Sequence, residues 1–322
     1  MKIIRFFFLF AFLISCQKSK SHDYSFYYWR THLSLNAIEK TALNKSTSPY
    51  IYTRFFDIEK VAGKFQPVAV ITKDHTFKTN KEVIPVVFIK NDVFYDITLD
   101  EINFLAQNIA TLIKKKQIEF GFKVSTQIQI DCDWTAGTNK EYFAFLEKLR
   151  EFSKKEISCT LRLHQVKNSK LSGIPPVEKV FLMCYSTSSP LENSTKNSIL
   201  DFPTLKAYLK NIDLYPLEIE IALPIYSWGI VTNHLGKHKL INALSVEDLK
   251  NVNFKKISDT EVEVIKDGFY FGNYLNKGFN LKVEEISEDQ LNQVKKFLNK
   301  KLSGYSIVYY HLDSRFLNHH SY

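Results

Sequence analysis

The sequence lacks the short motifs that mark several common kinds of site. Its 322 residues contain no CxxC pair and no HExxH segment, so no motif indicates a metal site. There is also no GxGxxG or GK[S/T] loop, which counts against a doubly wound sheet that binds nucleotides. No cofactor is therefore predicted. The absence of a nucleic-acid-binding motif predicts that nucleic acid is not a partner.

Cysteine is scarce, with four in the whole chain. Cys16 lies directly after the amino-terminal leader. The three other cysteines, Cys132, Cys159 and Cys184, are an odd number. Each of these lies inside an apolar run typical of a buried strand, so we interpret them as buried free thiols. One disulfide between neighbouring strands remains an alternative.

The leader has the pattern of an export signal. A basic start is followed by an apolar run, Phe6 to Ile14, which is too short to span a membrane as a mature helix. The sequence LISC at residues 13–16 resembles a bacterial lipobox, in which the signal is cut before the cysteine and Cys16 carries the lipid. The alternative is an ordinary signal peptide with an incidental cysteine. We expect residues 1–15 to be a signal peptide and residues 16–23 a polar tether.

The charge pattern is consistent with an envelope protein. No acidic residue follows Cys16 immediately, so we expect a lipid-anchored chain on the periplasmic face of the outer membrane. The formal charge of +9 falls to 9 − 2 = +7 when Lys2 and Arg5 leave with the signal. The lysines are spread along predicted helices, which is typical of solvated helix faces.

Residues 24–322 predict a single α/β domain. With 45% hydrophobic residues the chain can bury a large core. Runs typical of strands alternate with stretches typical of helices, which favours a (β/α)8 TIM-like barrel over a doubly wound sheet. Weak periodicity over residues 236–285 predicts an insertion after the seventh strand. The predicted strands are residues 24–35, 50–58, 83–89, 125–135, 157–166, 180–186, 217–228 and 305–312.

The fourth predicted strand, STQIQIDCDWT at residues 125–135, alternates strictly between polar and apolar residues. Its polar face ends in Asp131 and Asp133. Because helix-like stretches flank it, we expect a parallel strand whose polar face points into the barrel. Barrel enzymes place their chemistry at the carboxyl ends of the strands, so these two aspartates are candidate catalytic groups. Their backbone spacing of about 6.6 to 7 Å leaves both retaining and inverting glycosidase geometries open.

Polar and aromatic residues also end the other predicted strands. If the strands close into a barrel, these side chains meet in one cleft. Aromatic rings together with carboxylates and guanidinium groups are typical of sugar sites, because rings stack on pyranose faces and charged groups bind hydroxyls. Deeper in the barrel, Glu220 is predicted to pair with Arg54 or Arg162. The predicted substrate-binding residues are Trp29, Arg30, Arg54, Asp57, Arg162, Gln165, Tyr185, Tyr226, Trp228, His311, Asp313 and Arg315.

Short pieces of the chain resemble motifs of family 18 glycoside hydrolases. The IDCDW of residues 130–134 is similar to their DxDxE strand, and Met183-Cys184-Tyr185 is similar to their Met-x-Tyr. Trp228 or the aromatic residues of the eighth strand would floor the sugar site. The resemblance implies a barrel and substrate-assisted cleavage of N-acetylhexosamine linkages. The chain departs from the family at Thr135, which stands where the family has its proton-donating glutamate, so the leaving group has no matched donor.

A longer resemblance, over most of the mature chain, is to a Bacteroidetes-type group of bacterial TIM-barrel lipoproteins. Their segments QIDxD, RLHQ, GxPPV, ALPxxSW and YHLDSRF look like residues 129–133, 162–165, 173–177, 222–228 and 310–316. This resemblance implies the fold and no particular reaction.

The first functional hypothesis is a glycoside hydrolase-like enzyme with Asp131 and Asp133 as catalytic carboxylates. One would be held ionised by Arg162 or Arg315, and the other would have its pKa raised by its like-charged neighbour. Either His164 or His311 is an alternative proton carrier.

The second hypothesis is a non-catalytic binder of glycan or peptidoglycan that has kept the cleft and lost the acid. The third is a structural envelope lipoprotein whose partner docks on residues 236–285. In each case we expect a monomer, held at the membrane through the lipid on Cys16.

Overall fold

The computed structural model describes residues 22–192 and 195–317. The expected signal peptide, the lipidation site Cys16 and residues 17–21 of the expected tether lie outside this part of the chain. At its start, the ring of His22 stacks on Tyr305 with the ring centroids 4.0 Å apart. Its Nε2 also lies 2.8 Å from Oδ1 of Asn299. The chain is therefore held against the barrel domain from His22 onward.

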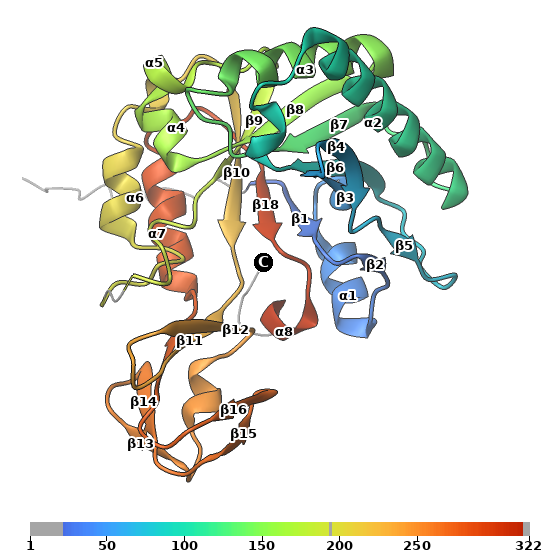
Figure 1. Ribbon diagram of the computed structural model, residues 1–322. Coiled ribbons are helices and arrows are strands. Elements are labelled where there is room, and N and C mark those ends of the chain that lie inside the picture. The colour runs from blue at the N-terminus through green and yellow to red at the C-terminus, as the bar shows by residue number, and fades with distance from the viewer. Residues whose placement is uncertain (1–21, 193–194, 318–322) are drawn as a thin grey trace, which may run out of the picture.

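Within the described residues, eight parallel strands form a closed barrel (Figure 1). Closure is made by β1, which pairs with β18 on one side and with β3 on the other. The (β/α)8 fold predicted from the sequence is confirmed. The barrel strands are β1 (Tyr24–Tyr28), β3 (Tyr50–Val61), β6 (Glu82–Ile89), β7 (Gln127–Asp131), β8 (Glu156–Leu161), β9 (Lys179–Met183), β10 (Glu218–Pro224) and β18 (Ile307–Tyr310).

Helices lie on the outside of the barrel (Figure 1). Thr98 begins one of them with a capping box, in which its side chain accepts from the backbone N–H of Glu101 and the carboxylate of Glu101 accepts from the backbone N–H of Thr98. Ser287 begins another helix with a capping box of the same kind, made with Gln290. The α-helices are α1 (Ala37–Lys45), α2 (Leu99–Glu119), α3 (Asn139–Ser153), α4 (Leu163–Lys167), α5 (Ser169–Ser172), α6 (Phe202–Tyr208), α7 (Glu288–Leu298) and α8 (Ser314–Leu317), and the 3-10 helices are η1 (Asn91–Phe94), η2 (Ile212–Leu214) and η3 (Val246–Leu249).

The fifth strand is shorter than predicted. The sequence indicated a strand over residues 157–166, but β8 ends at Leu161 and α4 begins at Leu163. The side chain of Gln165 stabilises the turn, because its Oε1 accepts from the backbone N–H of Arg162 at 2.7 Å and its Nε2 donates to the carbonyl of Trp134 at 2.9 Å. These bonds replace strand pairing after β8.

A second, antiparallel sheet follows the seventh barrel strand and has its own apolar core. It begins at Trp228, which the sequence had placed at the end of the seventh strand, and runs to Glu284. Figure 1 shows this sheet beyond the carboxyl ends of β10 and β18. Its strands are β11 (Trp228–Thr232), β12 (His238–Asn242), β13 (Phe254–Lys256), β14 (Glu261–Val264) and β17 (Asn280–Glu284), and a hairpin of β15 (Gly268–Tyr270) and β16 (Asn273–Leu275) lies beside it.

Smaller strands complete the described secondary structure. The edge ribbon β4 (Lys64–Val68) pairs antiparallel with β3, and β2 (His32–Leu33) pairs with β5 (Thr72–Lys73).

The cysteines Cys132, Cys159 and Cys184 are buried free thiols, as the sequence predicted.

The central strand β7 has the pleat that its alternation predicted. Gln129 is fully buried and accepts a hydrogen bond from the hydroxyl of Tyr27 on β1 at 2.8 Å. Ile128 and Ile130, on the opposite face, are buried in the main hydrophobic core. The polar face of β7 therefore points into the barrel and carries Asp131 at its carboxyl end.

The buried ion pair predicted for Glu220 has a different cation. Lys179 on the neighbouring strand β9 lies 3.3 Å from the carboxylate, and the backbone N–H of Ser306 donates to it. Neither Arg54 nor Arg162 is the partner, because each pairs with an aspartate near the carboxyl ends of the strands. The strand order explains why Lys179 is the partner. Strands β9 and β10 are adjacent, and their register pairs Glu220 with Phe181, two residues from Lys179.

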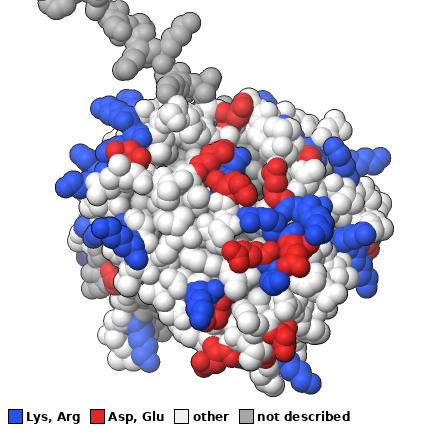
Figure 2. Space-filling model, turned by 90° about the horizontal axis from the view of Figure 1, so that it is seen from above, with Lys and Arg blue, Asp and Glu red and all other residues white. Residues whose placement is uncertain are grey.

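One face of the molecule carries charges of both signs. On the face drawn in Figure 2, Lys and Arg side chains lie among Asp and Glu side chains rather than in one continuous basic patch. Among the described helices, none has the length and apolar character that crossing a bilayer requires.

The side chain of Trp134 anchors the turn that follows β7, and its removal is expected to destabilise the fold. It is fully buried, stacks on Tyr142 at 5.1 Å and donates to the carbonyl of Ser172 at 3.0 Å. We expect Trp134→Ala to lower the free energy of unfolding by about 3–5 kcal/mol, measured by urea denaturation. Trp134→Phe keeps a stacked ring and should cost clearly less. Equal losses in the two variants would contradict this account.

Candidate functional site

A cavity of about 440 Å³ opens at the carboxyl ends of the barrel strands. Ten of the residues predicted from the sequence line it, namely Trp29, Arg54, Asp57, Asp131, Arg162, Tyr185, Tyr226, Trp228, His311 and Arg315. They come from β1, β3, β7, β8, β9, β10, β18 and the segments that follow these strands. The barrel therefore brings side chains that are far apart in the sequence to one place.

Aromatic rings form one wall of this cavity. Tyr185 stacks on Tyr310 with centroids 5.5 Å apart and an interplanar angle of 28°. Tyr226 meets both rings edge-on and lies 5.2 Å from Trp228, while Trp29 lies 5.5 Å from Tyr310 on the other side. Burial raises the pKa of Tyr226 to about 12, so its hydroxyl stays protonated at neutral pH. The wall offers uncharged ring faces and edges to a ligand.

Asp131 is the buried carboxyl in the cavity. Its exposed fraction is 6%, and the hydroxyl of Thr160 on β8 donates to its Oδ1 at 2.7 Å. Burial, and then the nearby charge of Asp133, raise the pKa of Asp131 to about 6, against the opposing effects of Thr160 and Arg162. Asp131 therefore changes between its protonated and ionised forms near pH 6, and in mildly acidic solution it can act as a general acid.

Asp133 stands next to Asp131 on the same polar face but is held by a cation. Nε and Nη2 of Arg162 donate to both oxygens of Asp133, the Nη2 bond being 2.8 Å long. Arg54 holds Asp57 in the same fork geometry, with Nε 2.6 Å from Oδ1 and Nη2 bonded to Oδ2. Such forks fix the planes of both partners. At the carboxyl end of β7, Asp133 is thus ion-paired, and the neighbouring Asp131 has a raised pKa.

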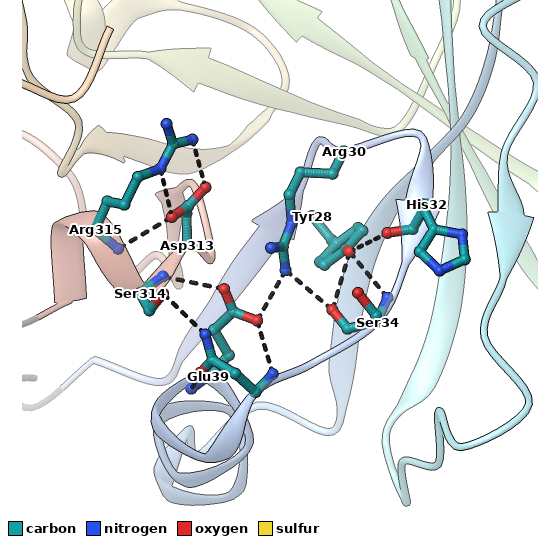
Figure 3. Close-up of polar contacts among 9 residues, drawn as sticks. Tyr28, Arg30, His32, Ser34, Glu39, Asp313, Ser314 and Arg315 are labelled. Carbon is teal, nitrogen blue, oxygen red and sulfur yellow. Dashed lines mark hydrogen bonds and ion pairs between the residues drawn. The ribbon is translucent and has the colours of Figure 1, made fainter. Parts of the chain in front are cut away.

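A third fork lies at the end of the eighth strand (Figure 3). Arg315 donates to Asp313 through Nε at 3.0 Å and Nη2 at 2.7 Å. Burial acts to raise the pKa of Asp313, but the hydrogen bonds and charge of Arg315 outweigh it, so the pKa is lowered. Below this pair, the buried carboxylate of Glu39 accepts from Nη2 of Arg30 at 2.8 Å and from the backbone N–H of Ser314 at 3.0 Å. Helix α1 is thereby tied to the start of α8.

His311 lines the cavity in the neutral form. Burial lowers its pKa to about 4, although the charge of Asp313 acts in the opposite direction. Within the described part of the chain, its buried Nδ1 has no hydrogen-bond partner. A neutral imidazole here can form a hydrogen bond with a ligand, but it lacks the second proton of the imidazolium form and so is not a general acid near neutral pH.

Five predicted site residues do not line the cavity: Arg30, Asp133, His164, Gln165 and Asp313. Arg30, Asp133 and Asp313 support the site through the ion pairs described above. Gln165 is buried and spends its side chain on backbone groups. His164 is exposed on α4, because the helix that begins at Leu163 carries it out of the strand.

The cavity also has lining residues that the prediction did not include, namely Phe88, Met183, Ser186, Ser227, Asn242, Tyr310 and Phe316. Met183 and Tyr310 had a signal, because the first belongs to the Met-x-Tyr resemblance and the second to the aromatic eighth strand. Asn242 comes from β12 of the inserted sheet. No pattern in the sequence connects that strand to the barrel.

No metal centre is visible in the described chain, where no group of three or more His, Cys, Asp and Glu side chains could hold an ion. The carboxylates near the cavity are instead held by guanidinium groups or, in Asp131, by a hydroxyl. The polar groups of this site are therefore suited to hydroxyl-rich or charged organic ligands.

Known structures share this architecture. The spore cortex-lytic enzyme SleL of Bacillus cereus matches with a TM-score of 0.57 and 15% identity, over 94% of this chain and 73% of that chain. A chitinase of Chromobacterium violaceum matches with a TM-score of 0.54 and 10% identity, over 92% of this chain and 97% of that chain. No family model and no curated protein matches the sequence. At these identities the likeness establishes the barrel fold.

The raised pKa of Asp131 gives a testable dependence of stability on pH. Its value is about 6 in the folded chain against an ordinary 3.8, so the folded state binds more protons between these pH values. The contribution of Asp131 to the free energy of unfolding is largely present below about pH 4 and is lost as the pH rises through about 6. The whole loss is about 3 kcal/mol. Asp131→Asn removes this dependence.

The free energy of unfolding of Asp131→Asn, relative to the parent, should therefore rise by about 2 kcal/mol between pH 4 and pH 7.5, because an aspartate of ordinary pKa is already partly ionised at pH 4. Urea denaturation of both proteins at the two pH values measures it. A difference that stays constant with pH would mean that Asp131 titrates normally.

Proposed function

We propose that this chain is a glycan-active barrel lipoprotein that binds a sugar chain in the cavity and acts through Asp131. The observation that carries the proposal is one cavity that combines a wall of aromatic rings with a buried carboxyl. Aromatic faces stack on pyranose rings, and a carboxyl whose pKa is about 6 can donate a proton. The likeness of the fold to a chitinase and to a cortex-lytic enzyme supports a glycan as ligand.

In the proposed reaction Asp131 is the general acid. Its proton passes to the glycosidic oxygen while the bond from that oxygen to the anomeric carbon breaks. The acetamido oxygen of an N-acetylated sugar attacks the anomeric carbon from the opposite face and forms a cyclic oxazolinium intermediate. Water then adds to the anomeric carbon and reopens this ring, which restores the acetamido group, and the carboxylate of Asp131 takes up the proton that this water loses. Asp133 does not line the cavity. Its role in this reaction is to raise the pKa of Asp131 through its negative charge.

A second candidate is a binder without turnover, and Thr135 favours it. This residue stands two positions after Asp133, where family 18 hydrolases have their acid. Here its hydroxyl accepts from the N–H of Gly137 at 3.3 Å, and the residue does not line the cavity. A barrel that has lost this acid can still hold a glycan on its aromatic wall.

The proposed place of action is the cell envelope. The basic and apolar leader, with Cys16 in a lipobox-like sequence, supports a lipid anchor, and glycan or peptidoglycan is then the polymer within reach. In this setting the anchor binds the membrane, and the cavity binds the polymer.

Turnover would be tested by incubating the full-length protein with a panel of bacterial, plant and animal glycans and measuring new reducing ends. We expect Asp131→Asn to lower kcat by about 10²–10⁴-fold, the contribution of a general acid. The matched control is Asp259→Asn, at a carboxylate that is 93% exposed on the inserted sheet. Binding without turnover in the parent would establish the second candidate. Absence of both would contradict the proposal.

The pH profile tests the role of Asp133. Activity that needs protonated Asp131 should fall as the pH rises through about 6. Asp133→Asn removes a like charge that raises this pKa and frees Arg162 to lower it further, so the falling limb should move to lower pH. If Asp133→Asn has the same melting temperature as the parent and its falling limb does not move, the loss of activity with pH is caused by the ionisation of a group other than Asp131.

A further inference from the structure

Arginine is a prominent charged component of the cavity wall. Arg54, Arg162 and Arg315 all line it, from β3, from the end of β8 and from α8. Each uses Nε and Nη2 to hold an aspartate. In the described chain, Nη1 of Arg162 and of Arg315 donates to no acceptor, and Nη1 of Arg54 is 3.5 Å from the carbonyl of Trp29. The forks therefore fix the guanidinium groups and leave N–H groups for a ligand.

Arg315 is the most accessible of the three. Its side chain is 56% exposed, against 28% for Arg162 and 19% for Arg54. Figure 3 shows its guanidinium group against Asp313 and away from Glu39. Asp313 is itself only 3% exposed, so the fork is anchored in the protein rather than in solvent. Arg315 is thus an accessible cation in a fixed orientation.

The segment that carries Arg315 is also fixed. Glu39 on α1 accepts from the backbone N–H of Ser314, and Nδ2 of Asn36 donates to the hydroxyl of Ser314 at 2.8 Å. Arg30 in turn donates to Glu39 from the other side. Because little side-chain freedom is left to lose, binding an anion at Arg315 costs less ordering entropy than it would at a mobile surface arginine.

These contacts lead to an inference that rests on the proposed function and narrows its substrate class. We propose that the cavity selects sugars that carry a carboxylate, and that Arg315 binds this carboxylate while the aromatic wall holds the ring. Guanidinium groups match the planar geometry of a carboxylate. In a glycan, such a group is either the lactyl ether of a muramic acid or the carboxylate at C6 of a uronic acid.

Asp131 is the charge that opposes an anionic ligand in the cavity. Asp57 and Asp133 are each covered by an arginine, whereas Asp131 is bonded to a hydroxyl. At pH 5, below its pKa of about 6, it is mostly protonated and the repulsion is small. The titratable and charged groups that interact electrostatically with Asp131 come from every element around it: Tyr27 from β1, Arg54 and Asp57 from β3, Cys132 and Asp133 after β7, Tyr142 from α3, Cys159 from β8, Arg162 after β8, Tyr185 after β9 and Tyr310 from β18.

The test compares each sugar that carries a carboxylate with its neutral counterpart. Dissociation constants of the full-length protein are measured by ligand-observed NMR at pH 5 for N-acetylmuramic acid against N-acetylglucosamine, and for glucuronic acid against glucose. We expect the acid of at least one pair to bind about tenfold more tightly or better, as one charge-assisted hydrogen bond provides. The pair with the larger ratio identifies the source of the carboxylate.

Variants at Arg315 assign the effect to this residue. Arg315→Gln should lower the preference for the acid, measured as the ratio of the two dissociation constants within a pair, to about one, and Arg315→Lys should restore part of the preference. The charge-matched control is Lys148→Gln on α3, which is paired with Glu151 and does not line the cavity. It should behave like the parent in both pairs.

The possible failures are distinguishable. If neutral sugars bind and acids bind no better, the carboxylate inference is wrong while the proposed function stands. If Arg315→Gln retains the preference, the carboxylate is bound elsewhere and the assignment to Arg315 is wrong. If neither these sugars nor the glycans of the wider panel bind, the proposed function fails and this inference fails with it.

Discussion

The mouth of the barrel is organised around a carboxyl group that is kept out of water. A buried carboxylate is costly unless it is paired or protonated, and Asp131 has a hydroxyl rather than a cation as its hydrogen-bond donor. The protein meets this constraint by placing guanidinium groups on the carboxylates around it, Asp57 and Asp133, and leaving Asp131 to titrate. The raised pKa is therefore a property of the whole rim, since it depends on which neighbour received the arginine.

The sequence was most informative where one strand decides the geometry. The alternation of residues 125–135 predicted which side chains of β7 point inward, because the pleat leaves no other choice once both faces are packed. The barrel order also followed, since parallel strands joined by helices converge at their carboxyl ends. This convergence is why Trp29, Tyr185 and Arg315 could be assigned to one cleft although they are far apart in the chain.

The sequence was least informative where a side chain redirects the backbone or where two sheets meet. Gln165 ends β8 through two bonds to main-chain groups, and no periodicity signals this, so His164 was expected on a strand and lies on a helix. Asn242 reaches the cavity from the inserted sheet, whose position depends on tertiary packing. The cation beside Glu220 also depended on knowing which strand is its neighbour.

The contact of His22 with Tyr305 has a consequence for how an anchored chain would stand. Tyr305 precedes β18, at the amino-terminal end of the barrel, whereas the cavity lies at the opposite end of the same strands. If Cys16 carries the proposed lipid, residues 17–22 span at most about 20 Å, so the amino-terminal end would stay near the bilayer. The opening of the barrel would then face away from the membrane, toward whatever polymer fills the space beyond it.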